Sequence, residues 1–515
     1  MITKNILLKI SRYLIIFLLI IGSACGKKPQ ELENSGVILI KSNEVINSDF
    51  IGNGAQWGGY ELLRDWTGND DFSNEDWEKL KLRIDYMRPP FLRIMVDGNW
   101  NYIRDNTYDR TKTSDALLRI LQYCQDNDIT VMFGEWGHKY LNGDITNINE
   151  QWLSWAADYL DWMVNTNGFT CIKYFNMVNE PNGDWSSTNG NYTLWRSLMT
   201  KFQTQMENRG LDEMVQLVGP DVAVWDAGLA TWVSNTARDM GDFVDLYDIH
   251  TYPEQSFVRG DEYLIMLNQY KEAVPEGKQI VMGEIGFKYT GNDIELKEEN
   301  EDRISNDPYA SDDCNMFIYD SFYGIDMSDA MIQCMMAGFG GSLVWDMDDA
   351  MYNKPDYSAG DIYNAKKLKR WGFWNILGEE VCKNADDEEI RPFFYPISLL
   401  CRYFPAGSEI YKVSLPNKYG LRAIAAQKDG YYTIALVNSH YVSYKNLLLQ
   451  ADTLPALKNI NKYTYLSGQG ADYTGSVDEN GFPLPEVVDM EMDLQKGILL
   501  DVKGQSVMVF TNMTF

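Results

Sequence analysis

Short apolar runs recur along the first two thirds of the chain, and helical periodicity fills the segments between them, for example 114–127, 192–208 and 327–337. Eight runs can be counted, at residues 50–57, 91–98, 130–137, 172–181, 215–222, 244–253, 279–287 and 341–348. They are apolar throughout and do not alternate, which is typical of strands buried on both faces. The pattern predicts an α/β protein with a (β/α)8 (TIM) barrel. An open doubly wound sheet is the alternative, but it does not account for eight repeats.

The pattern changes after about residue 391. Seven short β-rich segments follow, separated by turn signals such as Lys-Asp-Gly at 428–430; they lie at 408–414, 420–427, 431–437, 443–449, 462–465, 497–502 and 506–511. This texture predicts a C-terminal β-sandwich at 401–515, after a catalytic barrel at 36–400. Residues 36–46 precede the first barrel strand and could instead form an extra strand of the sandwich.

The N-terminus has the layout of an export signal. Basic residues precede an apolar run of nine residues at 13–21, too short to span a bilayer, and small residues lead up to Cys25. The segment resembles a bacterial lipoprotein signal, in which residues 1–24 are removed and Cys25 is acylated. With 25–35 as a polar tether, we expect an exported, membrane-anchored lipoprotein in the periplasm or at the cell surface. Gly22 stands where a larger aliphatic residue is commoner, so plain secretion is the alternative.

The composition of the chain restricts the kinds of binding partner that we expect. Apolar residues make up 45% and charged residues 23% of the chain, as in globular proteins. The net charge of −29 repels phosphate backbones and anionic headgroups, so we expect no nucleic acid partner and no membrane contact beyond a lipid anchor. The 15 Trp and 32 Tyr suit a neutral, polyhydroxylated ligand, although most of them must be core.

The chain lacks the residue patterns that several other kinds of active site require. The six cysteines after Cys25 match no zinc or redox spacing, and we expect buried apolar side chains, with an incidental disulfide as the alternative. The chain has no GxxxxGK[ST], HExxH or GxSxG motif, which argues against phosphate-cradle, zinc-protease and serine-hydrolase sites. We therefore expect no cofactor.

Two glutamates close barrel strands. The fourth run ends in Asn179-Glu180-Pro181 and the seventh in Gly283-Glu284. Because the active site of a (β/α)8 enzyme lies at the carboxyl ends of the strands, both carboxylates should reach one rim. Glycoside hydrolysis needs such a pair, one group to protonate the departing oxygen and one to attack or stabilise the anomeric carbon. A helix-start turn is the plain alternative for Asn-Glu-Pro on its own.

These strand ends resemble those of the clan A glycoside hydrolases, which include families five, thirty and thirty-nine; the pairing of a barrel with a β-sandwich is most similar to the last two. The resemblance implies that Glu180 is the acid/base, that Glu284 is the nucleophile and that Asn179 hydrogen-bonds the sugar 2-hydroxyl. It implies a retaining enzyme that cleaves β-glycosidic bonds of a poly- or oligosaccharide by double displacement.

Further positions fit the same resemblance. Arg93 corresponds to the arginine that keeps the nucleophile ionised, with a rim salt bridge as the alternative. His250 and Tyr252 lie where the clan often binds the sugar or the nucleophile. His138, just past the third strand, is a weaker candidate for substrate binding. A buried, satisfied imidazole is the alternative for both histidines.

Tryptophans also close strands. Trp345 ends the eighth run, and the resemblance implies that it lies beneath the scissile sugar. Trp136 ends the third run and is a further candidate for substrate binding, with ordinary packing as the alternative; Trp57, Trp100 and Trp185 are similarly placed at strand ends or in the loops that follow. Asp346, Asp348 and Asp349 could be taken for calcium ligands, but they lack the spacing of an EF-hand loop, and we expect no metal.

Three functions from different classes fit parts of this pattern. The retaining glycosidase is favoured because both carboxylates are present. A non-catalytic glycan-binding lipoprotein on a glycosidase-like barrel should have lost one of them. A metal-dependent hydrolase would need several histidines at strand ends, and the chain has three in all.

Overall fold

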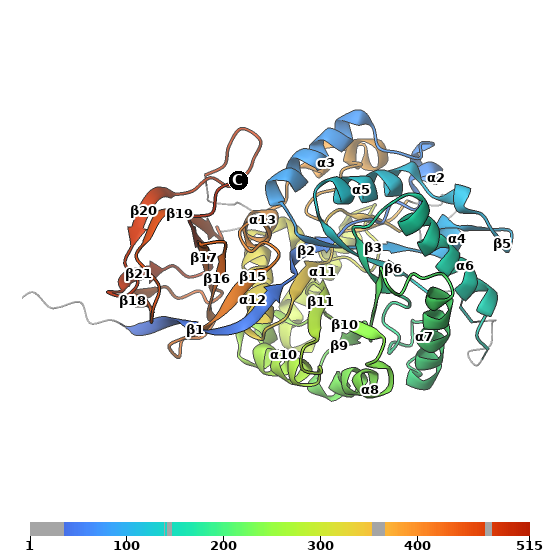
Figure 1. The fold of residues 1–515 in the computed structure, drawn as a ribbon. Helices are drawn as coiled ribbons and strands as arrows, with labels where there is room; N and C mark the ends of the chain where they lie inside the picture. The colour runs from blue at the N-terminus through green and yellow to red at the C-terminus, as the bar shows by residue number, and fades with distance from the viewer. Residues whose placement is uncertain (1–34, 138–139, 142–146, 353–365, 469–475) are drawn as a thin grey trace, which may run out of the picture.

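The computed structural model describes residues 35–137, 140–141, 147–352, 366–468 and 476–515 (Figure 1). The N-terminal signal and Cys25 lie outside the described residues, as does His138. Within the described ranges, no helix is long and apolar enough to cross a bilayer. The six cysteines at 124, 171, 314, 334, 382 and 401 are buried and unpaired, as expected.

Parallel strands form a closed barrel, which confirms the predicted eight-strand arrangement. The strands are β2 (Gly52–Gln56), β3 (Phe91–Val96), β6 (Thr130–Glu135), β7 (Ile172–Asn176), β8 (Gln216–Val218), β9 (Val222–Val224), β10 (Val244–Thr251), β11 (Gln279–Ile285) and β12 (Gly341–Val344). β8 and β9 both pair with β10 and together fill the fifth position, and β12 closes the ring by pairing with β2.

The barrel interior has an apolar layer and a polar layer. Its lower half holds an apolar cluster of Phe91, Met132, Val218, Leu246, Val281 and Leu343, one residue from each of six strands. Arg93 lies two residues beyond Phe91 on β3, and Glu284 lies three residues beyond Val281 on β11. The polar layer therefore lies towards the carboxyl ends of the strands, as in other barrels of this type.

Helices surround the barrel. The main ones are α3 (Asn74–Met87), α5 (Asp115–Asp126), α6 (Glu150–Asp161), α7 (Tyr192–Glu207), α8 (Ala230–Met240), α10 (Glu262–Glu272), α12 (Ser321–Met336) and α13 (Phe394–Arg402). Side chains of Ser73, Ser114, Asn149 and Asn191 accept the first free amides of α3, α5, α6 and α7. Further elements lie in the loops: α2 (Leu63–Thr67), α4 (Gly98–Asn101), β4 (Ile103–Arg104), β5 (Thr107–Tyr108), α9 (Gln255–Arg259), α11 (Ile294–Asn306), β13 (Ala350–Met351) and β14 (Leu368–Lys369).

A second domain consists mostly of sheet. Its order is β20-β19-β22-β17-β16-β15-β1-β18-β21. The strands are β1 (Gly36–Phe50), β15 (Ser408–Ser414), β16 (Leu421–Lys428), β17 (Tyr431–Asn438), β18 (Tyr444–Ala451), β19 (Leu457–Leu466), β20 (Val487–Met492), β21 (Ile498–Val502) and β22 (Ser506–Thr511). β1 pairs antiparallel with β15 and parallel with β18, so the N-terminal strand belongs to this domain (Figure 1).

The sheet curls around its own core. Leu447 and Leu449 of β18 share one buried cluster with Leu457 and Ile460 of β19, although the two strands lie near opposite ends of the sheet order. The helix α12 packs between this domain and the barrel, against β16, β17 and α13. Fourteen of its 16 residues are buried, because it is covered on both sides.

Candidate active site

The predicted catalytic and supporting residues converge at the carboxyl ends of the barrel strands. Arg93 comes from β3, Asn179 and Glu180 follow β7, His250 lies near the end of β10 with Tyr252 just after it, and Glu284 lies near the end of β11. Hydrogen bonds and ion pairs join all six into one network, so residues 191 positions apart in sequence are in direct contact.

Glu284 is held by a cation and a hydroxyl. The Arg93 guanidinium forms an ion pair with its Oε1, and the Tyr252 hydroxyl donates to its Oε2 over 2.6 Å. The Glu284 side chain is only 5% exposed. Both of its oxygens are therefore fixed, and the carboxylate is oriented before any substrate arrives.

Arg93 organises the centre of the site and is completely buried. It also donates to Gln56 and, over 2.7 Å, to the side-chain oxygen of Asn179. Burial opposes its charge, but the carboxylates of Asp221 and Glu284 raise the pKa of Arg93 above its ordinary value. The guanidinium therefore supplies a permanent positive charge at the floor of the site.

Glu180 lies across the site from Glu284. Its Oε1 lies 3.1 Å from His250 Nδ1, and its Oε2 accepts a 2.7 Å hydrogen bond from the indole N–H of Trp185. The backbone of Glu180 has a positive φ of 47° and is held there by a hydrogen bond from its N–H to the carbonyl of Asp221. A non-glycine residue in this region is sparsely populated and occurs where the surroundings fix it.

The two carboxylates lie close together. One oxygen of Glu180, one oxygen of Glu284 and a ring nitrogen of His250 all lie within 4.8 Å of one another. Retaining glycosidases have carboxyl groups about 5–5.5 Å apart, whereas inverting enzymes leave about 6.5–9.5 Å for a water molecule. The nearest oxygens of Glu180 and Glu284 are close enough to flank a single glycosidic bond.

Two aspartates complete the site, and sequence reasoning did not find them. Asp221 Oδ1 lies 3.1 Å from His250 Nε2, and its Oδ2 accepts from Asn176 over 2.8 Å. Asp248 accepts the Gly283 N–H over 2.6 Å. Asp248 precedes His250 by two residues on one strand, so the two side chains share a face, a signal that the sequence did offer.

Burial and charge set the protonation of this group. Burial alone would lower the pKa of His250, but Glu284 and Asp221 raise it well above its ordinary value. Burial would raise the pKa of Asp221, but His250 and Arg93 lower it. Burial raises the pKa of Asp248 to about 7, and the charge of Asp221 adds to the rise. We therefore take His250 as cationic and Asp221 as anionic, with Asp248 able to keep a proton near neutral pH.

Three groups of side chains in the described ranges have ligand-like spacing for a metal: Glu180, His250 and Glu284; Asp221, Asp248 and His250; and Asp76, Glu380 and Glu388. The first two share His250. Both ring nitrogens of His250 already contact carboxylates, those of Glu180 and Asp221, and Arg93 already contributes positive charge to Asp221 and Glu284.

Aromatic side chains line the site unevenly. Trp345 is buried and meets half-buried Trp136 edge to face, with ring centroids 6.2 Å apart. Trp371, which sequence reasoning missed, meets Tyr252 in the same way at 5.5 Å. Trp57 is fully buried and stacks on another core ring, so it is a packing residue.

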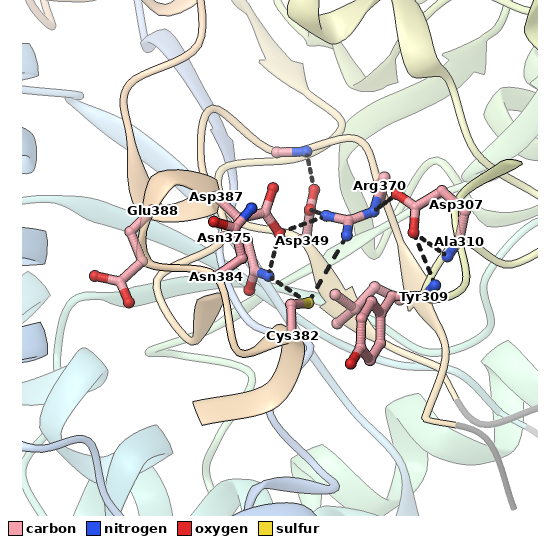
Figure 2. A network of polar contacts seen from close by, with 12 residues as sticks. Asp307, Tyr309, Ala310, Asp349, Arg370, Asn375, Cys382, Asn384, Asp387 and Glu388 are labelled. Carbon is pink, nitrogen blue, oxygen red and sulfur yellow. Dashed lines mark hydrogen bonds and ion pairs between the residues drawn. The ribbon is translucent and has the colours of Figure 1, made fainter. Parts of the chain in front are cut away.

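A buried ionic network supports the loop after β12 (Figure 2). Asp349 binds the guanidinium groups of Arg370 and Arg391 and accepts the backbone N–H groups of Trp371 and Gly372. Asp387 also binds Arg370, over 2.7 Å. The network holds the backbone at Trp371 and, through it, the ring beside Tyr252.

Asp348 and Asp346, which precede Asp349 in the same loop, bind other partners. Asp348 accepts from the Tyr60 hydroxyl over 2.6 Å and from the Ile376 amide over 3.0 Å. Asp346 follows Trp345 and is fully buried, and its Oδ1 accepts the Met347 N–H. The three aspartates thus bind different partners and do not form one of the ligand-like groups in the described ranges.

No protein-family model and no curated protein matches the chain. Solved structures do. A glycoside hydrolase family 30 subfamily 8 xylanase from Clostridium acetobutylicum has a TM-score of 0.56 at 13% identity, over 92% of this chain and 99% of the xylanase. An endo-β1,6-glucanase has a TM-score of 0.56 at 16% identity, over 94% and 95%. A family 51 α-L-arabinofuranosidase from Bifidobacterium longum has a TM-score of 0.59 at 11% identity, over 93% and 99%. At these identities the likeness shows the fold: this chain shares with three glycosidases a (β/α)8 barrel joined to a second, mostly β domain.

Proposed function

We propose that the chain is a retaining glycoside hydrolase that cleaves β-glycosidic bonds of a poly- or oligosaccharide by double displacement. One observation carries the proposal. The carboxylates of Glu180 and Glu284 meet within 4.8 Å at the carboxyl-terminal rim of the barrel, and Glu284 is held there by Arg93 and Tyr252. The fold of the glycosidase neighbours supports the same conclusion.

In the first step, Glu284 attacks the anomeric carbon and the bond to the leaving oxygen breaks. Glu180 gives its proton to that oxygen, which departs as an alcohol. Glu180 Oε1 faces buried His250, so Oε2, on the side of half-exposed Trp185, is the oxygen that reaches the leaving group.

In the second step, Glu180, now a carboxylate, takes a proton from water as the water oxygen attacks the anomeric carbon. The ester bond to Glu284 breaks, and the sugar leaves with its original anomeric configuration. His250 is the positioning residue for Glu180, because its other nitrogen is anchored to Asp221 over 3.1 Å. Its cationic form stabilises the carboxylate that Glu180 becomes.

Three residues would bind the reacting sugar. Asn179 is half-buried, and its side-chain oxygen is occupied by Arg93, so its amide N–H groups are the ones available to the 2-hydroxyl. Trp345 and Trp136 supply aromatic surface at the rim. The solved neighbours are a xylanase, an endo-β1,6-glucanase and an α-L-arabinofuranosidase, which favours a neutral glycan as the substrate class. His138 stays a candidate from the sequence alone.

The cellular setting follows from the N-terminal sequence. We expect Cys25 to be acylated and the mature chain to be anchored to a bacterial membrane, facing the periplasm or the exterior. Within the described part of the C-terminal domain, the curled sheet and its single core favour the predicted β-sandwich.

The test is a hydrolysis screen of the purified protein against xylans, β-glucans, mannans and aryl β-glycosides, followed by NMR of the first product formed. We expect the β-anomer to appear first and Glu284→Gln to abolish turnover. An α-anomer as first product would contradict retention. Glycan binding without hydrolysis by the wild type would favour the non-catalytic alternative.

A further inference from the structure

Trp185 combines high exposure with a fixed position. Its residue surface is 58% exposed, although tryptophan is on average a highly buried residue. Its indole N–H nevertheless donates to Glu180 Oε2 over 2.7 Å. The ring is therefore tied directly to the proposed proton donor while much of its surface faces solvent.

The backbone of Gly183 fixes the ring from one side. A methyl group added at Gly183 would lie 2.2 Å from Cε2, 2.5 Å from Cζ2 and 2.6 Å from Cδ2 of the Trp185 indole. Cε2 is bonded to both other atoms, so a point closest to it and almost equally far from its two neighbours lies above the ring face and not at its edge. One face of the indole is thus packed on glycine, which leaves the opposite face for a ligand.

The loop that carries Trp185 is held by its own hydrogen bonds. The Gly183 N–H donates to the Glu180 carbonyl over 3.0 Å, and the Thr188 hydroxyl donates to the Pro181 carbonyl over 2.8 Å. The Asn182 side chain exchanges two hydrogen bonds with the backbone of Ala223, in the next strand position. The exposure of Trp185 is therefore a property of an ordered loop.

We infer that Trp185 is the stacking platform for the sugar on the leaving-group side of the scissile bond. This inference rests on the proposed function, because it takes Glu180 as the group that protonates the departing oxygen. A ring hydrogen-bonded to that group lies beside the departing oxygen, so the saccharide attached to the oxygen must pass over it. A neutral pyranose or furanose ring presents C–H groups that suit an aromatic face. The enzyme should then favour a saccharide over a small alcohol as leaving group, and accept one as a glycosyl acceptor.

Binding at this subsite can be measured on its own, through the reactivation of a covalently labelled enzyme by an acceptor sugar. The protein is labelled with a 2-deoxy-2-fluoro-β-glycosyl fluoride of the sugar that the hydrolysis screen identifies, and excess reagent is removed. Fluoride departs without a sugar, so labelling of Glu284 reports the proposed function alone. Return of activity is then measured against rising concentrations of the methyl β-glycoside of the same sugar, which must occupy the leaving-group side to accept the glycosyl group.

We expect the acceptor to speed reactivation of the wild type with saturation. Trp185→Ala should raise the half-saturating acceptor concentration by a certain factor and change the labelling rate by a smaller one. The first factor should be at least ten times the second. Gly183→Ala should do the same, because the new methyl group displaces the ring; Gly183 has no positive φ, so the backbone tolerates the change. Trp185→Phe, which keeps an aromatic face but loses the N–H, should stay within about threefold of the wild type. Tyr431→Ala, at a 45% exposed aromatic of the C-terminal domain, is the control.

The outcomes are separable. If Glu284 is not labelled, the proposed function fails. If Glu284 is labelled but the acceptor does not speed reactivation, or if Trp185→Ala and Gly183→Ala keep the wild-type half-saturating concentration, the inference is overturned and the proposed function stands.

Discussion

At the scale of single residues, the site depends on side chains that orient a charge. Arg93 has no exposed surface and pairs with Glu284 and Asp221. Removing one partner of a buried ion pair costs about 3–5 kcal/mol, because the other charge stays buried. Arg93→Ala should therefore lower stability as well as turnover, and a hydroxyl deletion is the sharper probe of the chemistry.

Tyr252→Phe removes one hydrogen bond to the proposed nucleophile and leaves the ring in place. We expect kcat on an activated aryl glycoside to fall by about 10²-fold, as for loss of one preorganised donor, and the free energy of unfolding to fall by about 1 kcal/mol. Tyr444→Phe deletes a hydroxyl that donates over 2.7 Å to the Tyr419 carbonyl within the β domain; because this hydrogen bond is exposed, the variant should lose no more stability than Tyr252→Phe and keep full activity. Equal kcat in the two variants would show that Tyr252 does not assist Glu284.

The predicted residues at strand ends were found because their position follows from the barrel itself. Glu180 and Glu284 each stand where an apolar run closes, whereas Arg93 lies inside its run and was found through the family resemblance. Asp221 was missed because its importance comes from a contact with His250 across neighbouring strands, which no local pattern encodes. Asp248 lies two residues before His250 on β10, and this local signal was overlooked. The contact between Trp185 and Glu180 depends on the turn at Gly183, so the sequence pattern did not predict it either.

At the scale of elements, the barrel strands were predictable because continuous burial gives continuous apolar runs. The helix α12 begins at Ser321, earlier than the predicted segment 327–337, because burial on nearly all sides leaves little amphipathic pattern to read. The strand β20 was missed because most of its residues are exposed at the edge of the sheet. α11 has no buried residues and gave no apolar stripe.

The loop after β12 makes stability depend on pH through Asp348. Burial raises the pKa of this carboxyl from 3.8 to about 7. Between these pH values the folded state keeps a proton that the unfolded state has lost, so stability falls as pH rises from about 4 to about 7. Asp348→Asn removes this penalty.

The melting temperature of Asp348→Asn relative to the wild type should therefore be more favourable at pH 8 than at pH 4. Melting scans at intervals across this range measure the difference in melting temperature between the two proteins at each pH. A loss of stability that the substitution causes equally at every pH does not affect how this difference changes with pH. Asp429→Asn, at an exposed turn, should run parallel to the wild type. A parallel profile for Asp348→Asn as well would refute the assignment.

At the scale of the whole molecule, α12 joins the two domains through a buried charge. Asp329 of α12 lies 3.6 Å from Arg422 of β16 and accepts from the Ser439 hydroxyl. Arg422 also donates to the Gly260 carbonyl of the barrel. Because these groups are buried between the domains, we expect the barrel and the β domain to unfold together.

Arg422→Ala should lower the free energy of unfolding by about 3–5 kcal/mol, because it strips a buried carboxylate of its cation, and should leave KM unchanged, because Arg422 contacts none of the six residues of the site network. Calorimetry should show one transition at a lower temperature. Lys458→Ala, which removes a partner of an exposed pair, should change stability by less than about 1 kcal/mol. Two separate transitions in the wild type would show that the domains are independent.

The most direct test of the central claim is azide rescue of Glu180→Ala. On an aryl glycoside with an acidic phenol, the leaving group departs with little protonation, so the variant should form the glycosyl-enzyme on Glu284 and then stall without a base. Azide needs no base, and we expect it to restore turnover with a β-glycosyl azide as product. An α-glycosyl azide, or wild-type turnover by the variant without azide, would contradict double displacement with Glu180 as acid/base.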